Sequence, residues 1–383
     1  MKNTYGNALR VTIFGESHGA GIGAVVDGLT PGLCVDEAFI DHQLTLRRPA
    51  GSIATARRER DAIVFQGGVY NGKTTGAPLC IFIPNEDTRS RDYALSVARP
   101  SHADYTADCK YHGYQDGRGG GHFSGRLTAA LVAVGAILIP ALREKGIEIG
   151  THLLRCAGES DVALDDAPYN DCTTLRAQLC ALNEKPFAVL DEQAGERMIA
   201  AIEAAKGEGD SVGGVLESAI VGLPAGLGGP WFDTLESCLS HALFSIPAVK
   251  GVAFGDGFEV SELRGSQAND ALRVRDGSIV TKTNHSGGIC GGISNGMPVR
   301  IRCAIKPTPS ISKEQQTVDF VKREECNHII HGRHDPCIVH RARVVVDSVC
   351  AMVIADALLE RYGEDALSPT CDWAGMTRKG ESV

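Results

Sequence analysis

A short pattern of glycine turn, strand and second glycine turn occurs twice in the chain, and it limits the folds that the chain can adopt. The first copy covers residues 15–32 and the second covers residues 209–226, with matching glycines at equal spacing. Glycine adopts backbone conformations that other residues avoid, so both copies predict tight turns around a strand. The pattern indicates an internal duplication, and chance matching of glycines is the alternative. The fourth position differs, His18 against Val212, so the turn needs no imidazole and His18 is a candidate functional residue.

Periodicity and capping signals predict a mixed α+β chain. Alternating apolar residues predict strands at 8–14, 22–26 and 299–305. Helices are predicted after an N-cap at Asp36, from Ser124 to a kink or end at Pro140, and over 193–206 and 347–362. The stretches 47–60 and 97–121 lack periodicity and predict long loops. No linker divides residues 1–367, which we interpret as one catalytic domain, and the polar tail 368–383 is expected to fray.

Composition excludes several classes of protein. The chain has 383 residues, of which 43% are apolar, and a formal net charge of −9, which argues against nucleic-acid binding. An anionic ligand would therefore need positive charge gathered locally. The thirteen cysteines form no C-x-x-C pair, which predicts buried thiols in a reducing compartment rather than a metal or redox motif. We find no signal peptide and no apolar run of about 18 residues, so we expect a cytoplasmic protein without a membrane span.

Several polar clusters could carry chemistry. His102 lies two residues before Asp104, which could orient its ring. Three glycines at 119–121 precede a helix, a pattern typical of anion binding. The basic cluster contains Arg47, Arg48, Arg57, Arg58 and Arg60, and arginine matches phosphate or carboxylate oxygens in pairs.

Two further segments combine glycine or proline with polar groups. Residues 287–296 form a second glycine-rich stretch, and Lys306 with the hydroxyls of 308–310 could hold a phosphate on a rigid loop. His328, His331 and His334 are spaced by threes, but Gly332 and Pro336 would break a helix that aligned them. We therefore predict no metal site.

Together and in this order, these segments resemble the chorismate synthase family. The match spans nearly the whole chain: GESHG at 15–19, RRP at 47–49, RPSHADYT at 99–106, RGGG at 118–121, AVKGV and GDGF within 248–258, LRGSQ at 263–267, NHSGGICGGISNG at 284–296, KPTPSI at 306–311 and GRHDPC at 332–337. The resemblance implies a lyase of the shikimate pathway, which supplies aromatic amino acids. It converts 5-enolpyruvylshikimate 3-phosphate to chorismate and phosphate by 1,4-anti elimination, with reduced FMN and no net redox change.

The resemblance also implies roles for individual residues. His18 matches the histidine that protonates the leaving phosphate, His102 the one that manages protonation of reduced flavin, and Asp335 the carboxylate that assists proton removal. Ser17 and Ser124 match supporting serines. Arg47 and Arg48 match arginines for the substrate phosphate or NADP. The FMN positions are His122, Phe123, Ser124, Ala248, Gly291, Lys306, Pro307, Thr308, Pro309, Ser310 and Arg333.

Four departures from the family pattern affect the details of these contacts. Ser101 replaces a usual glycine, His122-Phe123 replaces an Arg-Ser pair, Ile53 stands where arginine is frequent, and Pro309 replaces a serine. The family fold is a layered β-α-β sandwich, and its members form homotetramers with FMN sites near subunit contacts. Both properties are expectations for this chain.

Two other functions fit the sequence less well. A flavin reductase or dehydrogenase would need a nicotinamide-binding fingerprint, but the residues before Gly119 are polar rather than a buried strand. An RNA-contacting glycine–arginine segment at 117–126 would be short for an acidic chain. The sequence leaves open whether FMN is reduced by an external partner or by NADPH.

Overall fold

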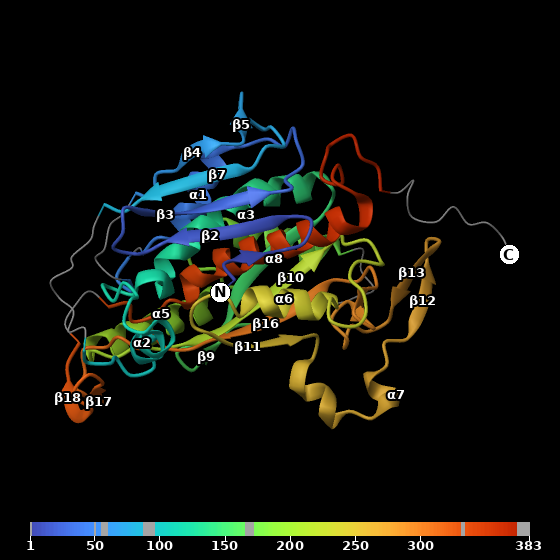
Figure 1. Ribbon diagram of the computed structural model, residues 1–383. Coiled ribbons are helices and arrows are strands. Elements are labelled where there is room, and N and C mark those ends of the chain that lie inside the picture. The colour runs from blue at the N-terminus through green and yellow to red at the C-terminus, as the bar shows by residue number, and fades with distance from the viewer. Residues whose placement is uncertain are drawn as a thin grey trace.

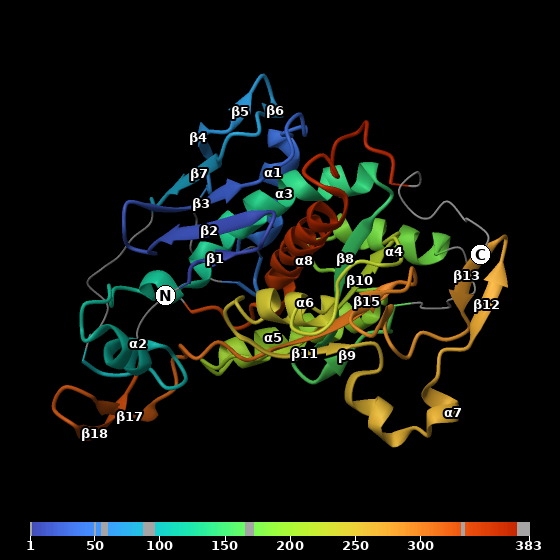
Figure 2. The same ribbon diagram turned by 45° about the vertical axis from the view of Figure 1, so that its right-hand side comes forward.

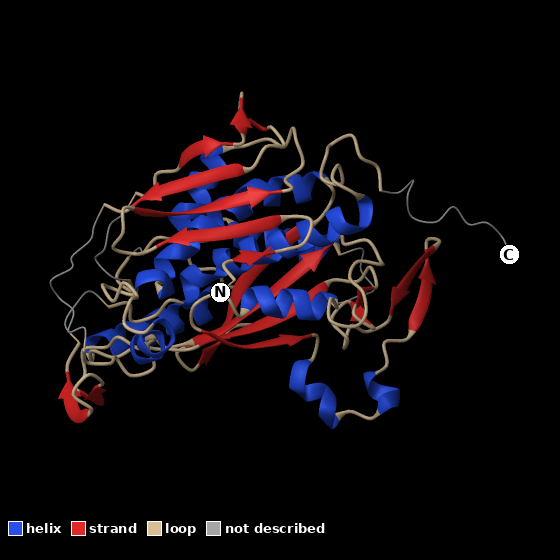
Figure 3. Ribbon diagram, viewed as in Figure 1, coloured by secondary structure: helices blue, strands red, loops and turns tan. Residues whose placement is uncertain are grey.

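Two antiparallel sheets lie on either side of a layer of helices in the computed structural model, which describes residues 2–49, 51–54, 60–86, 96–164, 172–330 and 334–373 (Figures 1 and 3). Apolar side chains from both sheets and from the helices between them form one core cluster. Helices α3 and α8 pack against each other at its centre. The first of them contacts the upper sheet of Figure 1, and the second contacts the lower sheet.

The upper sheet has the strand order β1-β2-β3-β7-β4. Strand β7 alternates between the buried residues Leu79, Ile81 and Ile83 and residues on the outer face that are only half-buried. This alternation is typical of a sheet with one face on the core. The bounds are β1 Thr4–Tyr5, β2 Arg10–Gly15, β3 Gly21–Asp27, β7 Leu79–Pro84 and β4 Val64–Gly67.

The lower sheet has the strand order β11-β16-β10-β8-β9 and is covered more completely. Strands β8 and β10 are buried on nearly every residue because α8 covers one face and α4 packs against β8 as well. The bounds are β11 Val249–Phe254, β16 Val299–Ile305, β10 Gly214–Val221, β8 Glu148–Cys156 and β9 Glu159–Ser160.

The remaining elements are helices and small hairpins. The helices are α1 Glu37–Arg47, α2 Asp104–Tyr111, α3 Thr128–Glu144, α4 Thr173–Asn183, α5 Glu192–Gly207, α6 Leu235–Leu243, α7 Gly265–Ala268 and α8 Val339–Tyr362, with 3-10 turns at Gly121–Phe123, Gly125–Leu127 and Gly257–Glu262. The hairpins pair β5 Val69–Tyr70 with β6 Lys73–Thr74, β12 Leu272–Arg275 with β13 Ser278–Thr281, β14 Ile289–Cys290 with β15 Ile293–Ser294, and β17 Gln315–Asp319 with β18 Glu324–His328. Hairpins β12–β13 and β17–β18 project from opposite ends of the molecule (Figure 2).

The two sheets repeat one order of connections. Neighbouring strands β2, β3, β7 and β4 of the upper sheet correspond to β8, β10, β16 and β11 of the lower one. Helices α1 and α6 follow the equivalent strands β3 and β10, and α3 and α8 come after β7 and β16. The turns after β3 and β10 also agree, because Gly28 and Gly222 both have positive φ angles. The turns before these strands differ: residues 15–19 join two strands, whereas residues 209–213 follow a helix.

Several helices confirm the predictions from local signals. The carboxylate of Asp36 accepts hydrogen bonds from the backbone of Ala38 and Phe39 and so caps α1. Helix α5 agrees with its prediction to within a residue at each end, and α8 ends before Gly363, which has a φ of 90°. Strand β16 has the predicted bounds.

Other local predictions were wrong. Residues 97–121 are not one long loop, because α2 lies within them. Ser124 caps the 3-10 turn before α3 rather than α3 itself. Pro140 does not end the helix, which continues to Glu144, because buried residues on both sides outweigh the lost backbone hydrogen bond. A kink at Pro140, the other predicted outcome, stays a prediction. Helix α8 begins at Val339 instead of Asp347.

The apolar helix α3 bears on the expected absence of a membrane span. The segment Gly125–Glu144 is long and apolar enough to cross a membrane by length and composition, which the sequence analysis missed. However, 83% of its most apolar window is buried inside the protein. It is therefore the core helix between the two sheets (Figure 1).

The cysteines and the tail also differ from expectation. All thirteen cysteines are free, but only Cys156, Cys303, Cys337 and Cys350 are buried. The first residues of the predicted frayed tail are packed: the Trp373 ring stacks on Tyr362 with 5.6 Å between ring centroids. The Trp373 indole N–H donates to the carbonyl of Ala366, which fixes the chain beyond α8.

Candidate active site

A cavity of about 780 Å³ lies beside the N-terminal turns of α3 and α8. Its volume is within the range that small-molecule and cofactor sites occupy. The wall is drawn from segments far apart in sequence, including the N-terminus, the loop before α2, the glycine run, the end of α6 and residues 306–310. The cavity therefore forms only when both sheets and the helix layer are assembled.

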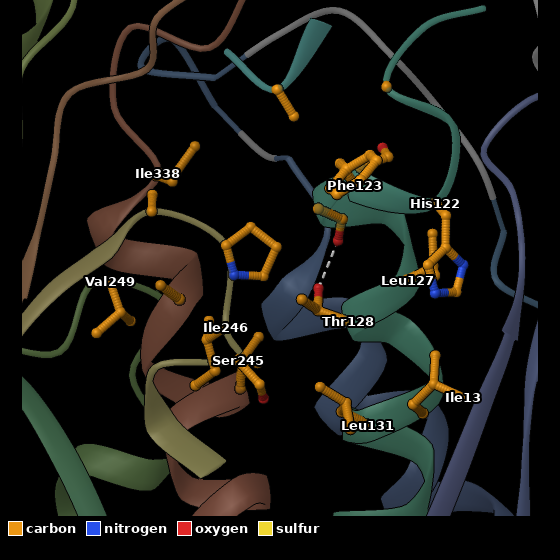
Figure 4. Close-up of a pocket in the computed structure, with 18 of the residues that line it drawn as sticks. Ile13, His122, Phe123, Leu127, Thr128, Leu131, Ser245, Ile246, Val249 and Ile338 are labelled. Atoms are coloured by element: carbon orange, nitrogen blue, oxygen red, sulfur yellow. Dashed lines mark hydrogen bonds between the residues drawn. The ribbon is translucent and has the colours of Figure 1, made fainter. Parts of the chain in front are cut away.

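Two apolar walls face each other across this cavity (Figure 4). Ile246, Val249 and Ile338 lie on one side, and Phe123, Leu127 and Leu131 lie on the other. A flat aromatic ligand would find apolar contact on both of its faces between these walls.

His18 lies in the turn between β2 and β3 and lines the cavity. The Ser17 hydroxyl is 3.2 Å from His18 Nδ1 and accepts from the Gly120 backbone N–H at 3.4 Å. A Cβ atom on Gly119, which has a φ of +69°, would lie 2.2 Å from His18 Cε1. The glycine run thus lets the backbone approach the imidazole; its predicted anion-binding role stays a prediction.

His122 and Ser124 belong to the short helical turns that follow the glycine run, and both line the cavity. His122 Nδ1 lies 2.8 Å from the carbonyl oxygen of Gly15, at the start of the His18 turn. The Ser124 hydroxyl accepts from the backbone N–H of Arg126. Both residues therefore support the local backbone of the cavity.

His102 is held by a carboxylate and a guanidinium. His102 Nδ1 is 2.7 Å from Asp104 Oδ1, and Arg99 donates to both oxygens of Asp104 at 2.6 and 2.8 Å. Although burial opposes ionisation, hydrogen bonds from Arg99 and His102 lower the pKa of Asp104. Arg99 also donates to the carbonyl of Gly119 at 2.7 Å, which ties this loop to the glycine run. His102 Nε2 is then the ring nitrogen that can exchange a proton with a ligand.

Residues 306–310 form a rigid edge of the cavity. Lys306 donates to the carbonyl of Ser101 at 2.6 Å, and burial together with the nearby Lys250 ammonium lowers the pKa of Lys306. The Ser211 hydroxyl donates to the carbonyl of Thr308. The Thr308 hydroxyl oxygen is buried and has no hydrogen-bond partner among the described residues. Thr308, Pro309 and Ser310 all line the cavity, and Ala248 lies beside them, because its carbonyl accepts from the Lys306 backbone N–H at 2.9 Å.

Asp335 lines the cavity just before α8 and accepts a hydrogen bond from Arg341 of the first turn of that helix. The Arg341 Nε atom is buried and without a hydrogen-bond partner in the described part of the chain. Arg333, predicted to bind FMN, lies outside the described residues.

Arg47 reaches the cavity from the end of α1, but its guanidinium already has a partner. It donates to Asp61 at 2.9 Å and is only 5% exposed. Burial lowers the pKa of Arg47 against the attraction of Asp61, and repulsion from Arg341 and Arg126 lowers it further. Among the described residues that line the cavity, basic side chains outnumber the carboxylate of Asp335.

Some predicted residues lie elsewhere. Within the described residues, Gly291 in the β14–β15 turn, Pro307 and Arg48 do not line the cavity. Arg57 and Arg58 fall outside the described residues, as does His331. Among the residues that the structure describes, no group of histidine, cysteine and acidic side chains could hold a metal ion.

Sequence reasoning missed several residues of the wall. Lys2 to Tyr5 line the cavity, and Tyr5 lies edge-on to His241 with 5.5 Å between ring centroids. Burial raises the pKa of Tyr5, whose hydroxyl donates to the carbonyl of Cys238. Arg341 was missed because it stands in a short polar stretch, with His340 and Arg343 beside it, that carries no motif. The only signal was its position in the first turn after GRHDPC.

The comparisons with known proteins identify the family of the chain. The model of the family described as chorismate synthase matches residues 9–359. The chain belongs to the chorismate synthase family. It is 46% identical to a chorismate synthase of Korarchaeum cryptofilum and 44% identical to one of Pyrococcus abyssi, each over 93% of this chain and 97% of the relative. A crystal structure of a chorismate synthase matches with a TM-score of 0.73 and 31% identity, covering 94% of both chains.

The structure shows the surroundings of the residues that depart from the family pattern. Ser101 has a φ of +59°, the left-handed region that glycine adopts most easily, which explains why glycine is usual in chorismate synthases at this position. Ile53 is 7% exposed and belongs to the core cluster, so it makes no polar contact in place of arginine. His122 and Pro309 line the cavity.

Proposed function

We propose that this cavity is where the chain converts 5-enolpyruvylshikimate 3-phosphate to chorismate and phosphate, with reduced FMN bound beside the substrate. The observation that carries the proposal is the convergence of His18, His102 and Asp335 on one cavity. These residues come from three segments far apart in the chain. Two imidazoles and a carboxylate next to arginines match an elimination that must receive a leaving phosphate and remove a proton.

The residues of the cavity fit FMN. The facing apolar walls suit an aromatic ring system, and the buried Thr308 hydroxyl lacks a partner that a phosphate oxygen would supply. Lys306 and Ser310 lie on the same edge and add an ammonium and a second hydroxyl. We therefore assign residues 306–310 and Ala248 to the cofactor, with His122, Phe123 and Ser124 on the other side.

The cationic groups fit a substrate that carries a phosphate and carboxylates. Arg47, Arg99 and Arg341 line the cavity, so positive charge is concentrated there although the chain is acidic overall. Guanidinium groups bind oxyanions through paired, charge-assisted hydrogen bonds. We place the substrate phosphate near His18, and we assign Arg47 to binding this phosphate rather than NADP.

The residues of the chain then divide the proton chemistry among them. Reduced FMN supplies an electron-rich ring that can lend electron density to the breaking carbon–oxygen bond and recover it. His18 donates a proton to the departing phosphate. His102, fixed through Nδ1 by Asp104, holds or moves a proton at Nε2. Asp335, oriented by Arg341, accepts the proton that the substrate loses. The apolar walls exclude water from these groups.

Anaerobic turnover tests this function. Purified protein with chemically reduced FMN and 5-enolpyruvylshikimate 3-phosphate should release inorganic phosphate and form chorismate in equal amounts. A parallel assay with NADPH and oxidised FMN decides whether the chain reduces its own cofactor. If folded protein loaded with reduced FMN releases no phosphate, the proposed function is wrong.

We further propose that the chain acts as a cytoplasmic homotetramer. Trp231 and Phe232 are 86% and 90% exposed, and Val274 and Ile279 of the β12–β13 hairpin are exposed as well. Large apolar side chains at the surface favour association. The Trp231 loop adjoins the turn of Gly291, because the backbone of Leu235 binds the carbonyl of Gly292. Gly291, away from the cavity of its own chain, then reaches FMN from a neighbouring subunit.

The organisation of the chain is also a proposal. We infer that the layered sandwich descends from a duplicated half, with the repeated strand order and the matched glycine turns as support. Residues 1–367 are taken as one catalytic domain. We also take the C-terminal tail to begin beyond the predicted residue 368, with the packing of Trp373 on Tyr362 as support.

A further inference from the structure

A fully buried carboxylate, Asp61, lies between three arginines at the edge of the cavity. Asp61 Oδ2 accepts from Arg47 at 2.9 Å and is 3.7 Å from Arg48 Nε, while Oδ1 accepts from Arg126. The Asp61 side chain has no exposed surface. Burial alone would raise the pKa of Asp61, but Arg47 and Arg126 lower it. Removal of a buried partner from such a cluster leaves uncompensated charge, so the cluster is rigid only while Asp61 is present.

Arg126 extends this cluster toward the upper sheet. Its side chain is 3% exposed and donates through Nε to Asn85 Oδ1 at 3.2 Å and through Nη2 to the carbonyl of Pro84 at 3.2 Å. Arg126 thus connects Asp61 to the end of β7, next to the turn that carries His18.

Asn85 completes the connection. Its side-chain amide donates to the carbonyls of Glu16 and Gly19 at 2.8 and 3.0 Å, the two residues that bracket Ser17 and His18. Its backbone N–H donates to the carbonyl of Ala20 at 3.2 Å. One amide side chain therefore closes the turn and also accepts from Arg126.

We propose that Asp61 and Asn85 are positioning residues, linked through Arg126, which hold Arg47 and the His18 turn in fixed relation across the cavity. The proposal rests on the proposed function, because Arg47 and His18 matter together only if a phosphate ester binds between them. Asp61 places the guanidinium that binds the oxyanion. Asn85 places the imidazole that delivers the proton. A displacement of about 1 Å at such groups can cost on the order of a hundredfold in rate.

The test separates placement from charge at Asp61. Asp61→Glu keeps the charge but lengthens the side chain, whereas Asp61→Asn keeps the shape and removes the charge. If Asp61 acts by placing Arg47, both variants raise the KM for 5-enolpyruvylshikimate 3-phosphate by about tenfold and change kcat less than about threefold, as expected for lost substrate binding. If Asp61 instead acts only through its negative charge, which weakens the positive potential of the arginines, the two variants should differ. Asp61→Asn would then lower the KM and Asp61→Glu would leave it unchanged, and this result overturns the proposal.

Asn85→Ala provides an independent measurement at the other end. It should lower kcat by about tenfold or more with a smaller change in KM, because the proton donor rather than the oxyanion site is displaced. This arm keeps the proposal testable even if the Asp61 variants do not fold. An unchanged kcat in folded Asn85→Ala protein contradicts the role of Asn85.

Glu217→Gln is the matched control. Glu217 is also fully buried and also accepts from two arginines, Arg300 and Arg302, but none of the three lines the cavity. Glu217→Gln should lower the thermal midpoint while leaving KM and kcat within about twofold of the unmodified protein. If the Asp61 variants change KM no more than this control does, the proposal is overturned. Absence of turnover in the unmodified protein would instead refute the proposed function.

Discussion

At the residue scale, the cavity is built from side chains that other polar groups hold in place. His102 is fixed by Asp104, which Arg99 holds in turn, and Asp335 is held by Arg341. The loop that carries His102 includes Ser101 in a left-handed backbone conformation, although this conformation costs serine more free energy than it costs glycine. Such supporting contacts fix the direction of a proton donor or acceptor before a ligand arrives.

Removal of the His102 imidazole tests its part in the chemistry. His102→Ala should keep FMN affinity within about tenfold and lower the turnover rate on the order of a hundredfold, the usual range for an acid–base group. Anaerobic kinetics and flavin titration measure the two quantities. His42→Ala is the control, because His42 is 40% exposed in its side chain, lies opposite Glu184 and does not line the cavity. An unchanged rate would exclude His102 from the mechanism.

Motifs predicted some site residues and could not predict others. His18, His102 and Asp335 stand in distinctive glycine- or proline-containing segments, and the structure brings them to one cavity. Asp61 and Asn85 stand in ordinary sequence, and their importance comes only from partners far away in the chain. Charged partners that meet through folding leave no local pattern, so reasoning from sequence does not find them.

At the scale of elements, local signals predicted helix ends where the local residues decide them. The Asp36 cap and the end of α8 at Gly363 are examples. The start of α8 was missed because its first turns contain His340, Arg341 and Arg343, which look like a polar loop. Arg343 is 1% exposed and donates to the carbonyl of Lys185, so tertiary contact rather than periodicity extends the helix. The short polar helix α2 was missed for a similar reason, since only Ala107 in it is buried.

The packed segment after α8 makes a prediction about the ends of the two central helices. Trp373 stacks on Tyr362 of α8, and the ammonium of Lys145, just beyond α3, lies 5.5 Å from its ring centroid. Trp373→Ala should lower the free energy of unfolding by about 1–2 kcal/mol, from the lost ring contacts and burial. Denaturant unfolding measures the change. Equal stability of the variant and the unmodified protein would show that this segment does not brace the helices.

At the scale of the whole molecule, the lower sheet contains a buried ionic network distant from the cavity wall. His152 on β8 is fully buried, and its two ring nitrogens lie 3.1 Å from Asp161 and from Glu217. Glu217 also accepts from Arg300 and Arg302 of β16. His152 is on β8, Glu217 is on β10 and both arginines are on β16, so the network joins these three strands on one face of the sheet.

This network should make stability depend on pH. Although burial opposes ionisation, hydrogen bonds from His152 and from the Leu164 backbone lower the pKa of Glu217 from 4.5 to about 2. Its contribution is present above about pH 4.5 and is lost as the pH falls toward 2. The carboxylate hydrogen bonds outweigh burial and raise the pKa of His152 above 6.5, so that contribution is full below 6.5 and is lost as the pH rises through the raised value.

The difference in thermal midpoint between the unmodified protein and Glu217→Gln should therefore be largest near pH 5 to 6 and shrink toward pH 3, because the Glu217 carboxyl of the unfolded chain becomes protonated below about pH 4.5. Thermal unfolding followed by circular dichroism across this range measures it. Glu159→Gln, at an exposed ion pair with Arg197, should show little pH-dependent difference. A difference for Glu217→Gln that stays constant from pH 6 to pH 3 would contradict the assigned ionisation.

The burial of α3 has a consequence for how the protein folds during its synthesis. On the ribosome, residues 128–144 emerge well before residues 339–362, which form the surface that finally covers them. A segment apolar enough to enter a lipid bilayer is thus left without its permanent partner while more than half of the polypeptide is still being translated. Nascent chains with such a delay are the ones that aggregate or engage chaperones. Helix α3 packs most extensively against α8, so its burial is completed only after the C-terminal half has been synthesised.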